Sequence, residues 1–367
     1  MASLILEDSA KIQGYNSKEH GEEATALHTQ EGVLNALELF ETLEYEVNTT
    51  IMDGVDLLFT DAGHILGSAV VNLKITEDDK TKSLCFTGDL GRYCNRILRP
   101  PMQCPQAEYI ICESTYGDKL HKCVDESEDQ LLEIVQNICI NKKGKLLIPA
   151  FSLGRTQELI YSFNKLAEAG KLPNIPVFVD SPLSVYATNI VRQHDHYFND
   201  GLKGYIKSDP DPFAFPQLKY ISELEHSKLI DASDELSVII STSGMMEGGR
   251  IQQHLKSNIG NSKNAVLITG YCEPTTIGGK LTRGDKTITI KEENYPVNAS
   301  ILFMKEYSAH ADYSDILTFL THHNKEKVKA IFLVHGEKIS MEKLKEKLEQ
   351  KKYQGIEMPR FRTAYHI

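Results

Sequence analysis

Apolar residues recur along the chain at two spacings, one typical of strands and one typical of helices. Near the start, short runs rich in β-branched or aromatic residues predict strands over 55–60, 69–76, 83–87 and 108–113. The polar segment Glu77–Lys80 between two of these strands predicts a hairpin turn. From Ser127 to Ile140 the apolar residues change to helical spacing, which predicts a helix.

In the middle of the chain, strands and helices alternate. A helix is predicted over Gln157–Ala169, where Gly170 ends it, and strands are predicted at Lys145–Ile148, Ile175–Val179, Ser237–Ile240 and Ala265–Thr269. This succession predicts an open, parallel α/β unit. The polar stretch Asp195–Pro216 is predicted to be a surface loop or an excursion from this unit. The final segments predict strand, helix, strand and helix over Ala299–Met304, Tyr313–His323, Val328–Val334 and Met341–Gln350.

The size and charge of the chain narrow the class of protein. Its 367 residues exceed one ordinary core, so we expect two domains. A net charge of −11 excludes a generally basic surface, although a cleft that holds a metal and a few arginines can still be locally positive. Seven cysteines without a CxxC pair are typical of reduced, buried thiols. Reduced thiols suit a cytoplasmic location, which we expect. No membrane partner is expected, because no apolar run has bilayer length.

Three short loops place a histidine or an aspartate beside glycine directly after an apolar run. The side chains are those of His64, Asp89 and His335, and the loops are Asp61–Ser68, Thr87–Gly91 and Val334–Glu337. Because glycine allows a sharp turn, these side chains are predicted to project from strand ends. Two imidazoles and one carboxylate are donors that suit zinc. Together the loops indicate a hydrolytic metal site.

These motifs, in this order, resemble the metallo-β-lactamase-fold nucleases of the β-CASP group. That group includes bacterial and archaeal RNA-processing enzymes and the cleavage-factor nuclease of mRNA 3′-end formation. His64 and Asp89 match the third and fourth metal motifs of the family. The acidic motif A, motif B and motif C match Glu113–Gly117, Ser308–Asp312 and His335. Three further segments also resemble sequences of this family, namely Leu6–Gln13, Pro149–Arg155 and Ser243–Met246.

The resemblance implies an α/β fold, a metallo-β-lactamase αββα sandwich with an inserted β-CASP domain. Residues 1–118 and 303–367 would belong to the sandwich, and residues 119–302 would form the insert. The active site is expected in the cleft between the two domains. The family holds two zinc ions, which supply the hydroxide nucleophile and neutralise phosphate oxygens.

Residue roles follow from the resemblance. His64 would bind one zinc, His335 the second, and Asp89 would bridge both, because a carboxylate has two oxygens. His310 would donate a proton to the leaving 3′-oxygen, and Glu113 would orient a histidine. Phosphate contacts are expected from Arg155, Ser243 and Gly244, since Arg155 stands at a predicted helix start and the other two just before a helix.

Each of these side chains also has a purely structural interpretation. His64 and His335 could be core histidines, Asp89 a turn residue and Glu113 a surface carboxylate; the flanking glycines and the ordered motifs favour the site. The segment around His310 could cap the following helix through Asp312, which is compatible with catalysis. Lys325–Lys329 is predicted to be a solvated turn. The histidines without a motif are predicted to pack or to lie on the surface, namely His121, His194, His196, His254, His322 and His323.

One family motif does not occur in this sequence. The main metal motif HxHxDH would stand upstream of Asp8, but His20 and His28 are the only histidines before His64 and cannot imitate it. By resemblance we expect an N-terminal truncation of roughly eighty residues of the hydrolase domain. A stable zinc site needs three or four protein ligands, so the zinc centre of this chain is expected to be incomplete.

The function expected from the resemblance is zinc-dependent cleavage of single-stranded RNA, by an endonuclease or a 5′-exonuclease. The alternative is a non-catalytic or truncated relative that binds RNA or a partner. A DNA-repair hydrolase is disfavoured by His335, because that branch usually lacks histidine at motif C. A thioester hydrolase would not need an insert of this size. The sequence leaves a homodimer open.

Overall fold

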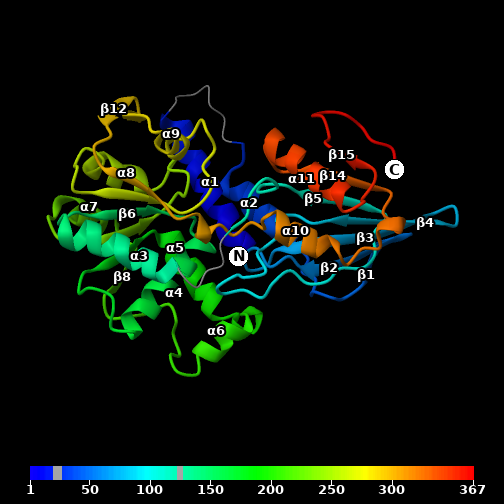
Figure 1. Cartoon of the computed structure of the whole chain (residues 1–367), viewed down its shortest axis with the longest axis horizontal. Helices are drawn as coiled ribbons and strands as arrows, with labels where there is room; N and C mark the ends of the chain where they lie inside the picture. The colour runs from blue at the N-terminus through cyan, green and yellow to red at the C-terminus, as the bar shows by residue number, and fades with distance from the viewer. Residues whose placement is uncertain (20–26, 122–126) are drawn as a thin grey trace. The chain divides into compact units, whose positions relative to one another are not determined.

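The computed structural model describes residues 1–19, 27–121 and 127–367, which form two compact units. Unit 1 consists of Met1–Thr42, Leu131–Asp195 and Phe213–Met304, and unit 2 of Leu43–Gln130, His196–Pro212 and Lys305–Ile367. Figure 1 shows the elements of both units along the chain. His20, named above, lies outside the described residues.

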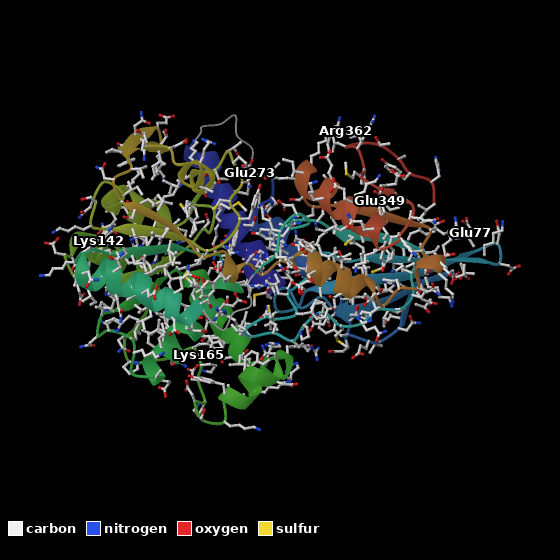
Figure 2. All side chains as sticks on the ribbon, viewed as in Figure 1. Glu77, Lys142, Lys165, Glu273, Glu349 and Arg362 are labelled. Atoms are coloured by element: carbon white, nitrogen blue, oxygen red, sulfur yellow. The ribbon has the colours of Figure 1, made fainter. Side chains whose placement is uncertain are left out.

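Unit 2 is built on a seven-stranded sheet with the order β1-β2-β3-β4-β5-β14-β15. Its strands are β1 (Thr49–Met52), β2 (Val55–Asp61), β3 (Ala69–Glu77), β4 (Lys80–Phe86), β5 (Tyr109–Glu113), β14 (Ala330–Val334) and β15 (Ile356–Glu357). Strands β1 to β4 pair antiparallel in succession, whereas β4, β5, β14 and β15 run parallel to one another. The predicted strands and the Glu77–Lys80 turn are confirmed; Asp78 and Asp79 both have positive φ there, and Glu77 stands at the start of the turn (Figure 2).

Two helices cover one face of this sheet, α10 (Tyr313–Leu320) and α11 (Lys338–Gln350). Alternate residues of the central strands point toward them, so the core lies between the sheet and the helices. The core includes Cys85, Ile110, Cys112, Ile331, Leu333, Ile316, Phe319, Leu344 and Leu348. Burying each large apolar side chain contributes about 1.5–3 kcal/mol, which holds both helices on the sheet.

Unit 1 contains a parallel sheet with the order β13-β10-β6-β9-β7-β8, which confirms the predicted parallel α/β unit. The strands are β13 (Ser300–Phe303), β10 (Ala265–Ile268), β6 (Leu146–Pro149), β9 (Val238–Ser241), β7 (Val177–Asp180) and β8 (Leu218–Ile221). The four central strands are buried along their whole length, as their continuous apolar sequences require.

Most helices belong to unit 1. They are α1 (Ala2–Glu19), α2 (Gln30–Leu37), α3 (Ser127–Val135, which begins in unit 2), the π-helix Gln136–Asn141, α4 (Arg155–Glu168), α5 (Pro182–Arg192), α7 (Leu224–Ala232), α8 (Ile251–Asn258) and α9 (Ile277–Arg283). The strands β11 (Thr287–Ile290) and β12 (Glu293–Pro296) form a separate hairpin. Short 3-10 turns occur at Asp195–Tyr197, Lys305–Tyr307 and Lys325–Lys327.

The segment predicted as a loop over Asp195–Pro216 is partly helical, so that prediction was wrong. It contains α6 (Asp200–Tyr205), which begins because the side chain of Asn199 accepts the Leu202 N–H at 2.7 Å. Leu202 and Phe213 are buried, so the segment is packed into the protein despite the polar composition that suggested a loop. In the described residues no helix is long and apolar enough to cross a membrane.

The compact units differ from the predicted domain ranges 1–118, 119–302 and 303–367 mainly in three segments. Met1–Thr42 groups with the parallel sheet of unit 1, where α1 contacts α5, whereas residues 119–130 and His196–Pro212 group with unit 2. In unit 2, Asn199 contacts the backbone of Asn95 and Tyr197 packs on Tyr45. The assignment of these ranges to a sandwich and an insert stays a prediction.

Candidate functional site

The candidate site lies at one edge of the unit 2 sheet, where several strands end together. Strands β4, β5 and β14 are parallel neighbours, so the residues after their carboxyl ends meet at one edge. Asp89 follows β4, Glu113 ends β5, and His335 follows β14 with φ of 51°. In the register of the sheet, Val334 stands opposite Glu113.

The loop that carries His64 closes tightly against the loop that carries Asp89. The Gly91 N–H donates to the Ala62 carbonyl at 2.8 Å, and a Cβ on Gly91 would lie 1.8 Å from the Gly63 carbonyl oxygen. No side chain fits there, which explains glycine at that position. The backbone of His64 is held by the Ser68 hydroxyl, which accepts its N–H at 3.1 Å.

His310 reaches the same edge from the loop before α10. The following Ala311 N–H donates to the Leu90 carbonyl at 2.8 Å, so this loop pairs with the Asp89 loop. Asp312 caps α10 by accepting the N–H groups of Ser314 and Asp315. The predicted helix cap is therefore confirmed, and it fixes the backbone two residues after His310.

The structure brings His64, Asp89 and His335 together as expected. The distance is 3.9 Å from His64 Nε2 to Asp89 Oδ2 and 3.3 Å from His335 Nδ1 to Asp89 Oδ1. The His310 ring centroid lies 4.5 Å from that of His64 and 5.5 Å from that of His335. The convergence is confirmed, whereas the role of each side chain stays a prediction.

Glu113 is buried and connects three parts of the site. Its Oε1 accepts the Leu90 N–H from the Asp89 loop, and its Oε2 lies 3.2 Å from His310 Nδ1. The Thr115 hydroxyl donates to the same Oε2 at 2.7 Å. The expected contact of Glu113 with a histidine is thus present, and the histidine is His310.

Thr115 is a positioning residue that the sequence analysis did not single out. Besides Glu113, its hydroxyl contacts His335 Nδ1 at 3.1 Å and the His335 carbonyl at 3.0 Å. Its position two residues after the motif A carboxylate, at the end of the same strand, was the available signal. Thr115 therefore links the carboxylate that holds His310 to the loop that holds His335.

The electrostatics of the site keep one imidazole neutral. Burial lowers the pKa of His64 to about 4, and the nearby His310 acts in the same direction. A neutral ring has a lone pair that can bind a metal. The side chains of Asp89 and His335 are 41% and 55% exposed, so an ion can reach the site from solvent.

The residues present fit a zinc ion in their chemistry and spacing. Donor atoms of His64, Asp89 and His310 lie within 4.8 Å of one another, and so do those of Glu113, His310 and His335. Tetrahedral zinc with ligands at about 2.0–2.1 Å separates its nitrogen and oxygen donors by roughly 3.3 Å, close to the distances seen here. Among the described residues, this edge supplies three imidazoles and two carboxylates.

The predicted phosphate-binding residues belong to unit 1. Arg155 is the first residue of α4, and its guanidinium lies over the Phe151 ring at 5.5 Å. Gly244 packs against the same ring, since a Cβ there would lie 3.0 Å from it. The buried Ser243 hydroxyl has no hydrogen-bond partner among the described residues. Ser243 and Gly244 do not stand directly before a helix, because α8 begins only at Ile251.

Two family models match the chain. The Beta-Casp domain model matches residues 156–281, within the range predicted for the insert. The model described as a Zn-dependent metallo-hydrolase RNA specificity domain matches residues 294–359, which include His310 and His335. The second match supports a metal cofactor for this chain.

Similar proteins include two prokaryotic relatives and one animal relative. A ribonuclease of Thermus thermophilus is 29% identical over 339 residues, which cover 92% of this chain and 73% of the relative. An RNase J-like protein of Methanocaldococcus jannaschii is 31% identical over 317 residues, 86% of this chain and 71% of the relative. The cleavage and polyadenylation specificity factor 73 of Drosophila melanogaster is 29% identical over 352 residues, 94% of this chain and 48% of the relative. The chain therefore belongs to the β-CASP family of metallo-β-lactamase-fold RNA-processing nucleases.

Proposed function

We propose that the site to which these residues belong hydrolyses phosphodiester bonds of single-stranded RNA with the help of zinc. The observation that carries the proposal is the contact of His310 with the buried Glu113, beside His64, Asp89 and His335. A module that only binds RNA or a partner would not need a carboxylate-held imidazole next to a donor set that suits zinc. The named activities of the relatives support the same function.

His64, Asp89 and His335 would hold the metal. When bound, zinc would supply Lewis-acid polarisation of water and of the phosphodiester. Asp89 would contribute a carboxylate oxygen beside each histidine, because its two oxygens face His64 and His335 separately.

His310 would act as the general acid for the leaving 3′-oxygen. The contact of its Nδ1 with Glu113 fixes the ring, so Nε2 is the atom that would deliver the proton when the phosphorus–oxygen bond breaks. A buried carboxylate also stabilises the protonated ring before transfer. Thr115 would maintain this arrangement by binding the same carboxylate oxygen.

Arg155, Ser243 and Gly244 would contact the RNA backbone. A guanidinium and a hydroxyl are suitable partners for phosphate oxygens, and glycine lets the backbone approach the ligand closely. We further infer a cytoplasmic location, which agrees with the free cysteines among the described residues.

We also infer that these 367 residues alone retain zinc weakly. HxHxDH does not occur in the sequence, and the assigned ligands give each of two ions only two of the three or four that stable binding needs. Turnover by this chain alone should therefore be negligible.

The test compares this chain with the same chain fused to an HxHxDH-bearing segment of a relative. Each form is loaded with zinc and incubated with single-stranded RNA labelled at its 5′ end. We expect cleavage by the fusion and none by its Asp89→Ala variant. Release of labelled mononucleotides would indicate a 5′-exonuclease, and longer labelled fragments an endonuclease. A fusion that binds zinc stoichiometrically but leaves RNA intact would contradict the proposed function.

A further inference from the structure

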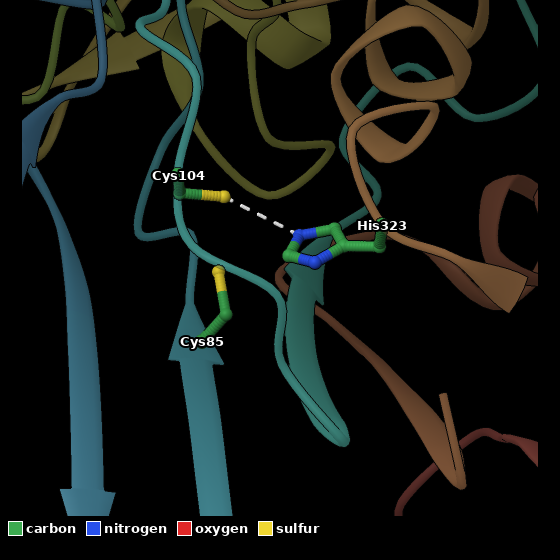
Figure 3. A group of neighbouring side chains, drawn as sticks. All are labelled: Cys85, Cys104 and His323. Atoms are coloured by element: carbon green, nitrogen blue, oxygen red, sulfur yellow. Dashed lines mark hydrogen bonds between the residues drawn. The ribbon is translucent and has the colours of Figure 1, made fainter. Parts of the chain in front are cut away.

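A second group of reactive side chains lies inside unit 2, apart from the site described above. Cys85 stands on β4, Cys104 lies in the segment before β5, and His323 follows α10. Figure 3 shows the two sulfur atoms beside the imidazole ring. All three residues are buried, and their donor atoms lie within 4.8 Å of one another.

Two hydrogen bonds determine which ring nitrogen of His323 carries the proton. The Ala107 N–H donates to Nδ1 at 3.2 Å, so Nδ1 is an acceptor and has no proton. A neutral imidazole must then carry its proton on Nε2. Nε2 lies 3.3 Å from the Cys104 sulfur, and the bond therefore runs from the ring to the sulfur (Figure 3).

This direction disfavours a metal ion among the three side chains. A histidine that binds a metal through Nε2 normally donates the N–H of its other nitrogen to a carbonyl or a carboxylate. Here Nδ1 faces the Ala107 N–H. If Nε2 of a neutral ring bound a metal, Nδ1 would carry the proton, and its N–H would point at the Ala107 N–H. The arrangement instead suits a sulfur atom that accepts a proton from the ring.

The same contacts favour a thiolate at Cys104. A hydrogen bond from the Cys85 thiol lowers the pKa of Cys104 to about 5, and the bond from His323 acts in the same direction against the effect of burial. The same hydrogen bond, between Cys85 and Cys104, raises the pKa of Cys85. Because the His323 N–H donates to Cys104, Cys104 is the nucleophile of the pair, and Cys85 keeps its proton.

We propose that Cys104 and Cys85 form an oxidation site, in which Cys104 reacts with hydrogen peroxide and Cys85 resolves the product to a disulfide. His323 acts as a positioning residue that stabilises the Cys104 thiolate. Peroxide is the suitable oxidant because it is small, and both sulfurs are buried. The sulfurs already lie within 4.8 Å, so the resolving thiol is within reach.

The reaction has two steps. The Cys104 thiolate attacks one oxygen of hydrogen peroxide; a sulfur–oxygen bond forms, the oxygen–oxygen bond breaks and hydroxide leaves, so sulfur is oxidised and peroxide reduced. The Cys85 sulfur then attacks the Cys104 sulfenic acid. A disulfide forms, the sulfur–oxygen bond breaks, and the leaving oxygen departs as water with the Cys85 proton.

The experiment treats the full chain with hydrogen peroxide at pH 7 and quantifies each cysteine by mass spectrometry after a denaturing quench. We expect a Cys85–Cys104 disulfide that dithiothreitol reverses. Cys112 is the internal control, because it is buried on the neighbouring strand and burial raises its pKa. Cys104 should react at least about tenfold faster than Cys112, since the thiolate is the reactive form.

Variants separate the roles of the three residues. In Cys85→Ser, Cys104 sulfenic acid should persist and be trapped by dimedone, whereas Cys104→Ser should leave Cys85 reduced. His323→Phe should slow oxidation of Cys104, and His323→Gln, which keeps a donor and an acceptor, should restore part of the rate. Oxidation of Cys104 no faster than that of Cys112 in the wild-type chain would overturn the proposal. So would a stoichiometric metal that Cys104→Ser loses and Asp89→Ala retains.

Discussion

His310 Nδ1 lies 3.2 Å from Oε2 of Glu113, a carboxylate buried at the end of a central strand. The two residues are 197 positions apart in the sequence. Because Glu113 also accepts the Leu90 N–H and the Thr115 hydroxyl, it is fixed in place and can hold only one orientation of the ring. In the zinc-loaded fusion protein, the roles of His310 and Glu113 can therefore be separated from those of the metal ligands.

Replacing His310 and His335 should separate proton transfer from metal binding. His310→Ala should lower the rate of RNA cleavage by roughly 10²-fold or more, the range for loss of a general acid, while bound zinc stays near wild type. His335→Ala should lower both zinc content and activity. Zinc is measured by mass spectrometry and activity by single-turnover cleavage. Equal zinc loss in the two variants would show that His310 is a ligand.

Removing the charge of Glu113 should impair His310 without emptying the metal site. Glu113→Gln keeps the size and one acceptor oxygen but no longer stabilises a protonated ring, so cleavage should fall by about 10–100-fold. Zinc content and the KM for RNA should change little. The control is Glu108→Gln, a half-buried residue directly before the same strand, where it pairs with Lys329. A large rise in KM with kcat unchanged would contradict the positioning role.

The chain by itself should contain little zinc. After dialysis against a buffer with trace zinc, we expect clearly substoichiometric metal and no RNA cleavage above the level of Asp89→Ala, because too few ligands surround each ion. A chelator should then leave the thermal unfolding of the chain almost unchanged. Robust zinc-dependent cleavage that Asp89→Ala abolishes would disprove the expectation.

Stability should decrease at alkaline pH because of a buried ion network in unit 1. Burial by itself would lower the pKa of His254, but its bonds to Asp180 and Asp231, both 2.8 Å long, raise that pKa to about 9. The stabilisation is complete below the unfolded value of 6.5 and is lost as pH rises through about 9. The free energy of unfolding in urea should fall by up to roughly 3 kcal/mol over this window.

A variant of His254 provides the control for that pH dependence. His254→Gln should destabilise the protein by about 3–5 kcal/mol at pH 6.5, because it removes the cation that Asp180 and Asp231 share, while Arg250 still contacts Asp180. It should also flatten the slope between pH 6.5 and 9. An unchanged slope in the variant would assign the pH dependence to other groups.

The cap of α6 should make a small, local contribution. Asn199→Ala removes the acceptor for the Leu202 N–H and should cost about 1 kcal/mol, whereas Asn199→Asp should cost less because aspartate also caps. Denaturant unfolding of the three proteins measures the difference. A loss of several kcal/mol in Asn199→Asp would point to the contact of the Asn199 amide with the Asn95 carbonyl instead.

The sequence by itself determined the local elements and the order of the motifs. Strands and helices could be predicted because apolar spacing reports which face of a segment is buried, as for β6 and α4. Glycines beside His64 and Asp89 marked turns at strand ends, since only glycine tolerates the backbone approach found at Gly91. Such signals involve residues that are close together in the chain, so they can be read from a single sequence.

The tertiary structure decided which distant side chains meet. Strand order and register bring Glu113 to His310, His254 between Asp180 and Asp231, and His323 to Cys104. No spacing predicts these contacts, because a histidine has the same sequence signature whether it packs, bonds to a carboxylate or stabilises a thiolate. The helix at Asp200–Tyr205 was missed for the same reason: burial of Leu202 depends on surrounding elements and not on the polar residues beside it.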